Sequence, residues 1–322
     1  MATGTSRAPV GYIAVVAAIL SFSLSTPIVK WAGVTGVVIA FWRMWLSTAT
    51  WWITLAVVRW RSHRAADTDP ESTITRVDYP DARTWKLVAP AGLCFGLNIS
   101  LLFTAVTRTS IAHLEFIASL TPLLVVPLGA KLFGERPNFS ALRFGVISVI
   151  GVAMVLFLGP ATGAATLAGD LLVVVVLGSW TSYLLFTKRA RAAGVHTVTF
   201  MACMMPIGLI ITVPLTVILA GDEIFGLTQR GWLTVALLTF LTGMVAHGSI
   251  AFAQQHLPIA TITIMQTSQP GLAVLFAFVI LDEQVRAPQI VGMALVIAGI
   301  VLFTRAAQRV AAPAADSTAQ PV

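Results

Sequence analysis

The feature that most limits how this chain can fold is a series of ten long apolar runs separated by short polar stretches. Each run is long enough to cross the roughly 30 Å hydrocarbon core of a bilayer as an α-helix. Only 10% of the 322 residues are charged, against about 25% in soluble proteins, which is too few to cover a water-facing surface. We therefore predict an all-α integral membrane protein with ten transmembrane helices. The runs fall at about 10–31, 35–59, 85–106, 110–133, 139–159, 168–187, 197–220, 229–256, 258–281 and 287–305.

Basic residues are distributed unevenly among the loops, and their distribution predicts the orientation. If the N-terminus lies in the cytoplasm, fifteen arginines and lysines fall on the cytoplasmic side and four on the other, with Arg43 inside a run. Membrane proteins keep their basic loops inside, so we expect a multi-pass protein of the inner (cytoplasmic) membrane with both termini cytoplasmic. The tails at 1–9 and 306–322 and a solvated loop at about 60–84 are then cytoplasmic. The net charge of +7 follows from this topology and does not indicate nucleic-acid binding.

The sequence contains an internal repeat with an offset of 148 positions. The matched pairs are Ala105 and Ala253, Ile111 and Ile259, Ala112 and Ala260, Pro122 and Pro270, Glu135 and Glu283, and Gly151 and Gly299. At the first and sixth runs an offset of 158 aligns Lys30 with Lys188. The chain thus divides into two five-helix halves, 10–159 and 168–305. Because five is odd, the halves cross the membrane in opposite directions, and many secondary transporters place their site at the interface of such inverted halves.

The prolines, acidic turns and glycines of the repeat carry a family resemblance. They are Pro122, Gly134-Glu135, Gly145 and Gly151 in the first half, Pro270, Asp282-Glu283, Gly292 and Gly299 in the second, together with Arg43 after Phe41-Trp42 and Trp180 near Tyr183. In this order they resemble the EamA repeat of the drug/metabolite transporter superfamily, over about 10–305. Asp282 stands where that family usually has glycine, and this difference affects the shape of one turn only. The resemblance implies a substrate-conducting carrier, commonly an exporter of amino acids, metabolites or drugs, with a central cavity between the halves.

Two polar stripes at equivalent places in the halves point toward one shared cavity. Helical spacing puts Glu115, Ser119 and Pro122 on one face of the fourth run. The corresponding face of the ninth run carries Thr263, with Gln266 beside it. An ionised carboxylate inside a helix costs about 2.5–3.5 kcal/mol on insertion scales, so Glu115 should face a wet cavity, pair with a cation or be protonated. It either contacts a substrate amine, carries a proton or forms a structural ion pair.

Arg43 is the natural partner for that carboxylate. The second and fourth runs both begin on the outer side, and at 1.5 Å per residue Arg43 lies roughly 12 Å and Glu115 roughly 8 Å from the start of its run. Alternatively, Arg43 extends toward the lipid head groups. A guanidinium left in the cavity would instead offer two parallel hydrogen bonds to a substrate carboxylate.

Other polar residues complete the expected cavity. Ser25 belongs to a polar and weakly broken first run, and Tyr183 either stacks on a substrate or packs. His113 and His247 are each a proton relay or a partner in an interhelical hydrogen bond, and Asn98 and Gln254 are further candidate cavity residues. The predicted cavity residues are Ser25, Arg43, Glu115, Ser119, Tyr183, Thr263 and Gln266, and the candidate proton-coupling residues are Glu115 and His113.

Some residues are expected to have structural roles. Gly92 and Gly96, four apart, predict a close helix contact. Glu135 and Glu283, near the ends of runs, are expected to cap helices or turns. The sequence predicts no metal site and no cofactor, because it carries no zinc-binding, nucleophile-elbow or phosphate-binding motif.

These observations favour a secondary transporter that exports a small polar metabolite, such as an amino acid, by alternating access. Its partners would be the substrate, the lipid bilayer and either protons or a counter-substrate, without nucleic acid. Efflux of hydrophobic cationic drugs is the alternative within transport. An intramembrane enzyme or a sensor is the alternative of another class, opposed by the missing catalytic motifs and the missing soluble output domain. The residues leave the substrate, the driving ion and the oligomeric state open.

Overall fold

A computed structural model describes residues 8–32, 35–68, 76–106, 111–135, 139–158, 167–281 and 287–311. Within these ranges the chain is helical and contains no strand. The first half comprises α1 (Ala8–Ser23), α2 (Ser25–Ala32), α3 (Gly36–Thr68), α4 (Ala82–Val106), α5 (Ile111–Ser119), α6 (Thr121–Phe133) and α7 (Phe139–Phe157). The second half comprises α8 (Leu167–Ala192), α9 (Thr197–Ala220), η1 (Gly221–Glu223), α10 (Gln229–Leu238), η2 (Thr239–Ala246), α11 (His247–Ala253), α12 (Ile259–Gln266), α13 (Gln269–Leu281) and α14 (Ala287–Ala311).

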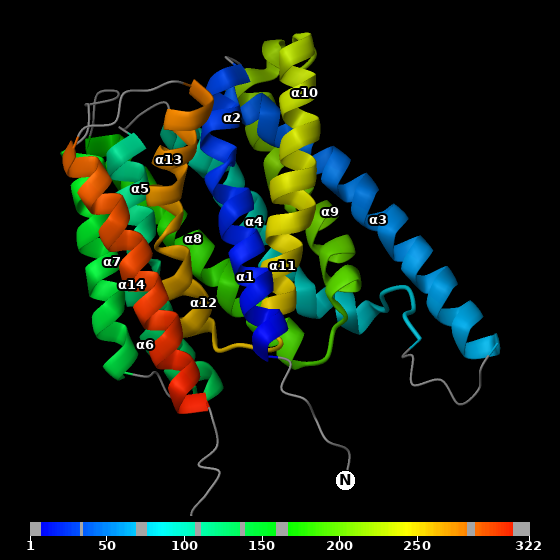
Figure 1. Cartoon of the computed structure of the whole chain (residues 1–322). Helices are drawn as coiled ribbons and strands as arrows, with labels where there is room; N and C mark the ends of the chain where they lie inside the picture. The colour runs from blue at the N-terminus through cyan, green and yellow to red at the C-terminus, as the bar shows by residue number, and fades with distance from the viewer. Residues whose placement is uncertain are drawn as a thin grey trace, which may run out of the picture.

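The helices pack side by side as a bundle (Figure 1). α1 begins and α14 ends at the same end of the bundle, the lower end in Figure 1, whereas α2 and the start of α10 lie at the opposite end. α3 leans outward, so that its C-terminal part lies apart from the other helices (Figure 1). The two ends of the described chain therefore share one side, as the predicted topology requires.

Six helical segments of the described chain are long and apolar enough to cross a membrane. They are Pro9–Val29, Ala82–Leu102, Phe116–Phe133, Leu171–Ala192, Thr197–Glu223 and Gln229–Ala253, and shorter apolar helices cover Arg143–Met154 and Ala287–Gly299. α3 is longer than any of these but carries Arg43 and several tryptophans, which lower its hydropathy. The protein is thus a multi-pass membrane protein, and the count of ten spans stays a prediction.

The loop predicted at about 60–84 is shorter than expected. α3 continues to Thr68, so the first part of the loop predicted at about 60–84 is helical. The helix continues because this segment has no glycine or proline to end it. α4 begins after Asp81, whose carboxylate accepts a hydrogen bond from the Thr84 amide at 2.8 Å. Hydrogen bonds with Thr84 lower the pKa of Asp81, as expected for an acidic residue that caps a helix.

Three of the predicted runs form broken helices rather than continuous ones. The interruptions separate α1 from α2, α5 from α6 and α12 from α13, and a proline follows each within three residues. Proline has no amide hydrogen to donate and its ring clashes with the carbonyl four residues earlier, so each break leaves polar backbone groups that must be satisfied locally. The interruptions lie at Leu24, Leu120 and Thr267–Ser268, and the prolines are Pro27, Pro122 and Pro270.

A π-helical segment, η2, joins α10 to α11. The indole Nε1 of Trp51 on α3 donates to the Gly243 carbonyl within this segment at 2.9 Å. A Cβ on Gly243 would lie 2.3 Å from Ser47 Oγ, so a larger residue here would require the Ser47 side chain to move. Such π-segments widen a helix locally and are frequent at functional sites.

Glycines allow the closest helix contacts. A Cβ on Gly96 of α4 would lie 2.3 Å from the carbonyl oxygen of Gly208 on α9, and one on Gly92 would lie 2.7 Å from Ile207 Cβ. The close contact predicted at Gly92 and Gly96 is therefore confirmed.

The two halves also meet in a reciprocal contact between α7 and α14. A Cβ on Gly151 would lie 2.6 Å from the Gly292 carbonyl oxygen, and one on Gly299 would lie 2.9 Å from the Phe144 carbonyl oxygen. The repeat offset of 148 relates Gly151 to Gly299 and Phe144 to Gly292. The second contact is therefore the first with the two halves exchanged. Each half therefore presents corresponding positions to the other, as in a self-complementary interface.

Candidate substrate cavity

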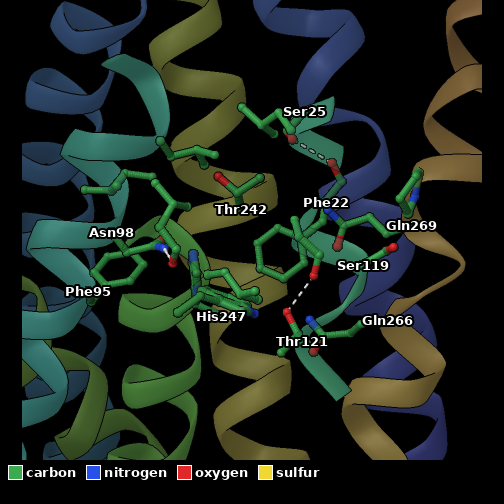
Figure 2. Close-up of a pocket in the computed structure, with 18 of the residues that line it drawn as sticks. Phe22, Ser25, Phe95, Asn98, Ser119, Thr121, Thr242, His247, Gln266 and Gln269 are labelled. Atoms are coloured by element: carbon green, nitrogen blue, oxygen red, sulfur yellow. Dashed lines mark hydrogen bonds between the residues drawn. The ribbon is translucent and has the colours of Figure 1, made fainter. Parts of the chain in front are cut away.

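A cavity of about 420 Å³ lies between the two halves. Its walls come from α1, α2, α3, α4, α5 and α6 of the first half and from α8, α10, η2, α11, α12 and α13 of the second. All three broken helices and the π-segment contribute, so the backbone irregularities gather around one space. Figure 2 shows side chains from both halves pointing into it.

The cavity extends toward the end of the bundle opposite the start of α1. Its lining there includes Val29 of α2, together with Thr35 and Gly36 at the start of α3. That is the upper end in Figure 1, and the predicted topology makes it the outer side.

A polar cluster ties the two halves together at the other end. The Glu135 carboxylate lies 3.3 Å from Lys188 Nζ and accepts a hydrogen bond from the amide of Ile259, the first residue of α12, at 3.0 Å. Lys188 Nζ also donates to the carbonyls of Gln254 and Leu257 at 2.8 and 2.9 Å. Glu135 is thus a capping residue, as predicted, but the helix it caps belongs to the other half. We call this cluster (Glu135, Lys188 and the start of α12) the latch.

Arg191 strengthens the same end of the bundle. Its guanidinium is buried and donates to the carbonyls of Ala251, at 2.8 Å, and Val195, and to the side-chain oxygen of Gln255. His196, next to it, caps the start of α9 by accepting a hydrogen bond from the Val198 amide. Partial desolvation of the ring, followed by the charge of Arg191, lowers the pKa of His196.

Arg43 lies on the cavity wall and is buried, with 4% of its surface exposed. It therefore does not extend to the head groups. Its Nε and Nη2 are buried and have no hydrogen-bond partner among the described residues. Glu115, its predicted partner, belongs to α5, but its side chain lies outside the described residues, as does that of His113. Arg43 is close enough to His247 to interact with it electrostatically.

Hydroxyl groups at the helix breaks present acceptor oxygens to the cavity. Ser25 Oγ donates to the Phe22 carbonyl at 2.6 Å, Ser119 Oγ to the Phe116 carbonyl at 2.7 Å, and Thr263 Oγ1 to the Ile259 carbonyl at 3.1 Å. The sequence predicted all three as cavity residues, and all three line it. Because each hydroxyl hydrogen is used by a carbonyl three or four residues earlier in the chain, the oxygen is left as an acceptor.

Amide side chains add a second kind of polar group. Gln266 lines the cavity as predicted, and its Oε1 is buried without a hydrogen-bond partner in the described part of the chain. Asn98 also lines it, with its Nδ2 donating to the Val176 carbonyl at 2.9 Å and to Ser179 Oγ at 3.2 Å. Gln254, a further candidate, instead donates to the Leu184 carbonyl at 3.2 Å and is not part of the lining.

Aromatic rings form one wall of the cavity. The His247 ring lies 5.0 Å from Phe22, 4.6 Å from Phe95 and 6.0 Å from Trp180, in edge-to-face arrangements. Tyr183, predicted to line the cavity, lies behind this wall and is fully buried, with its hydroxyl 3.4 Å from His247 Nδ1. The wall gives the cavity an apolar surface beside its polar groups.

Some lining residues were not predicted as cavity residues. His247 was weighed only as a relay or a hydrogen-bonding residue, and Thr242 was not singled out, because nothing in the sequence marks the π-segment. Phe22 and Phe95 resemble any apolar residue in a run. No group of three or more histidine, cysteine, aspartate or glutamate side chains is placed to bind a metal ion in the described ranges.

The comparisons with known proteins agree with this architecture. Residues 9–157 and 167–305 each match the EamA-like transporter family. No curated protein matches the chain. One solved structure, titled only "Crystal structure of protein", is similar with a TM-score of 0.72 and 18% identity, over 93% of this chain and 99% of the other; at this identity the likeness shows the fold alone. Because the family match spans both halves, the chain belongs to the EamA-like transporter family of the drug/metabolite transporter superfamily and is a membrane transporter of that type.

Proposed function

We propose that this transporter exports a small polar metabolite with a carboxylate group, and specifically an amino acid, from the cytoplasm by alternating access. The observation that carries the proposal is the Arg43 guanidinium, which lines the cavity and has two nitrogens without a hydrogen-bond partner among the described residues. Burying a guanidinium costs several kcal/mol unless hydrogen bonds offset the desolvation, and a bound substrate would supply hydrogen bonds to these two nitrogens. Arginine presents two parallel donors, which match a carboxylate.

The rest of the cavity complements the other parts of an amino acid. An ammonium group has three donors and no acceptor, and the oxygens of Ser119, Thr263 and Gln266 offer acceptors across the same space. The main-chain carbonyl of Gln266 is one more acceptor, because Pro270, four residues later, has no amide hydrogen to donate to it. The aromatic wall around His247 offers an apolar surface for a side chain.

Alternating access requires that the two ends of the cavity close in turn. The latch joins the halves at the end where α1 begins, and the cavity extends toward the opposite end. This arrangement supports an outward-facing state in which the latch must open before substrate enters from the cytoplasm. We infer that the halves are inverted repeats, because the α7–α14 contact is reciprocal and Ser148 Oγ donates to the carbonyl of Val296, its own repeat equivalent, at 3.4 Å.

The alternative transport function, efflux of hydrophobic cations, fits this cavity less well. Arg43 would repel a cation in a space where the low dielectric strengthens the repulsion. Membership of a transporter family also argues against an intramembrane enzyme or a sensor. Glu115 and His113 remain candidates for proton coupling, and a counter-substrate is the other way to drive export.

Efflux from proteoliposomes tests the proposal. The vesicles contain the purified protein and a mixed pool of labelled amino acids, with and without an imposed pH gradient. Selective loss of one or a few amino acids supports the proposal, and a response to the pH gradient shows that protons drive it. Retention of the whole pool, while hydrophobic cations move in the same preparation, overturns it.

A further inference from the structure

The C-terminal part of α3 carries a charged surface that the transport proposal does not use. It lies at the end of the bundle where α1 begins, and it leans away from the neighbouring helices (Figure 1). A surface depression of about 420 Å³ opens there, lined by Arg59, Trp60, His63, Arg64, Asp67 and Thr68. We call it the α3 depression.

The acidic groups at the α3 depression are already paired. Asp67 accepts a hydrogen bond from Arg76 at 2.8 Å, and Asp78 lies 2.8 Å from His63 Nε2. Within the described ranges no carboxylate pairs with Arg59 or Arg64. The depression therefore has an excess of positive charge.

Aromatic rings hold the two free guanidinium groups in place. The Arg59 guanidinium lies over the Tyr79 ring, 4.7 Å from its centre, and its Nε is buried without a hydrogen-bond partner. The Arg64 guanidinium lies over the Trp60 ring at 5.4 Å. A guanidinium stacked on a ring keeps the N–H groups at its edge free for an anion.

The residues that precede the depression on the same helix face are apolar and exposed. Ile53, Val57 and Trp60 are 63%, 42% and 58% exposed and stand four and three residues apart, with Arg64 four residues further on. These spacings place all four on one stripe. At 1.5 Å per residue the stripe from Ile53 to Arg64 is about 16 Å long, which is about half of the roughly 30 Å hydrocarbon thickness. The aliphatic residues thus lie at the level of the acyl chains of one leaflet, the aromatic residue at the interface and the basic residue at the level of the head groups.

We propose that the α3 depression binds an anionic phospholipid, with its phosphate on Arg59 and Arg64 and an acyl chain along Ile53 and Val57. The stripe favours a lipid over a free phosphate, because Ile53 and Val57 belong to the expected membrane-spanning run directly before the arginines, so an anion bound at Arg59 and Arg64 lies at the level of the lipid head groups. Trp60 lies at the junction, where the indole contacts the glycerol region.

Quenching of tryptophan fluorescence by brominated lipids tests this directly. The full-length protein is placed in phosphatidylcholine vesicles with 20 mol% of either brominated phosphatidylglycerol or brominated phosphatidylcholine. The protein has nine tryptophans, so the difference between wild type and Trp60→Phe isolates the signal of Trp60. The test variants are Arg59→Gln and Arg64→Gln, and Arg61→Gln, exposed on the same helix but outside the depression, is the matched control.

The proposal expects Trp60 to be quenched preferentially by the anionic lipid. Any basic residue near the surface, Arg61 included, contributes about a fivefold preference for anionic lipid, and a direct hydrogen bond to the phosphate adds roughly tenfold or more; each test variant should therefore lose roughly fiftyfold or more, whereas Arg61→Gln should lose about fivefold. Equal loss in Arg61→Gln would contradict a specific site, because the preference would then reflect overall charge. Competition by inorganic phosphate at millimolar concentration would contradict a lipid ligand and assign the depression to a free anion.

Discussion

Replacing Arg43 by glutamine should separate substrate binding from folding. If the guanidinium donates two hydrogen bonds to a substrate carboxylate, and hydrogen bonds to charged groups contribute about 1.5–3 kcal/mol each, the loss is at least about 3 kcal/mol. That corresponds to roughly 150-fold weaker binding, since about 1.4 kcal/mol is a factor of ten. Arg43→Lys keeps the charge but loses the planar pair of donors, so its affinity should be intermediate.

The same substitution should not destabilise the empty protein. In the absence of substrate, the guanidinium is buried with two nitrogens that have no partner among the described residues, and if it forms no ion pair with Glu115, removing its charge is neutral or stabilising. We therefore expect the thermal midpoint of purified Arg43→Gln to equal or exceed that of wild type, while the increase caused by amino acids disappears. Arg143→Gln, an exposed arginine of α7, is the matched control. A lower midpoint with normal substrate stabilisation would refute the reasoning and make Arg43 a structural residue.

Four further predictions concern packing, the latch and protonation. Gly96→Ala should destabilise the protein by about 1–3 kcal/mol, because its Cβ would meet backbone 2.3 Å away, whereas Gly178→Ala, with open space around it, should be neutral or slightly stabilising in thermal unfolding. Glu135→Gln should weaken the latch and increase, at least severalfold, the labelling from the cytoplasmic side of a cysteine introduced at Thr242 on the cavity wall, in a protein whose Cys94 and Cys203 are replaced by alanine; unchanged labelling would show that the latch does not gate access. The pKa of His196 is lowered in the folded protein, so its contribution to stability is complete above the unfolded value of about 6.5. That contribution is lost as the pH falls through the folded pKa. His196→Asn keeps a helix cap but cannot titrate, so its thermal midpoint should decrease less than that of wild type between pH 7 and pH 5. If Glu115 carries the proton, Glu115→Gln should abolish transport driven by a pH gradient and preserve substrate exchange. Loss of gradient-driven transport, of exchange and of protein expression would instead show that Glu115 has a structural role.

Local features of the structure were predictable because they depend on local chemistry. Pro122 and Pro270 break their helices wherever these pack, since proline removes a hydrogen bond within its own segment. Gly92 and Gly96 form a helix contact because small residues four apart leave a flat strip. A weak break was expected in the first run, where Ser25 lies, whereas Ser119 was expected from its place on a polar helix face; both line the cavity.

Features that depend on the pairing of distant helices were not predictable. Arg43 was expected to have three alternative environments, and only the packing of α3 against the second half shows that it is buried on the cavity wall. Glu135 was expected to cap a helix or turn, but no local pattern indicates that the helix start it caps lies 124 positions away. The π-segment that precedes His247 accepts a hydrogen bond from Trp51 of another helix, a contact that no local pattern indicates. Tyr183 lies behind the wall because its neighbour Trp180 faces the cavity instead.

The most direct test of a carboxylate site at Arg43 is counterflow with matched substrate pairs. Proteoliposomes loaded with an amino acid that the protein transports are diluted into labelled amino acid, into the labelled amine obtained by decarboxylating it, or into a labelled hydrophobic cation. The account predicts uptake of the amino acid alone, with roughly 150-fold weaker apparent affinity in Arg43→Gln, given two charge-assisted hydrogen bonds. Equal uptake of the decarboxylated amine, or faster uptake of the hydrophobic cation that persists in Arg43→Gln, would contradict it.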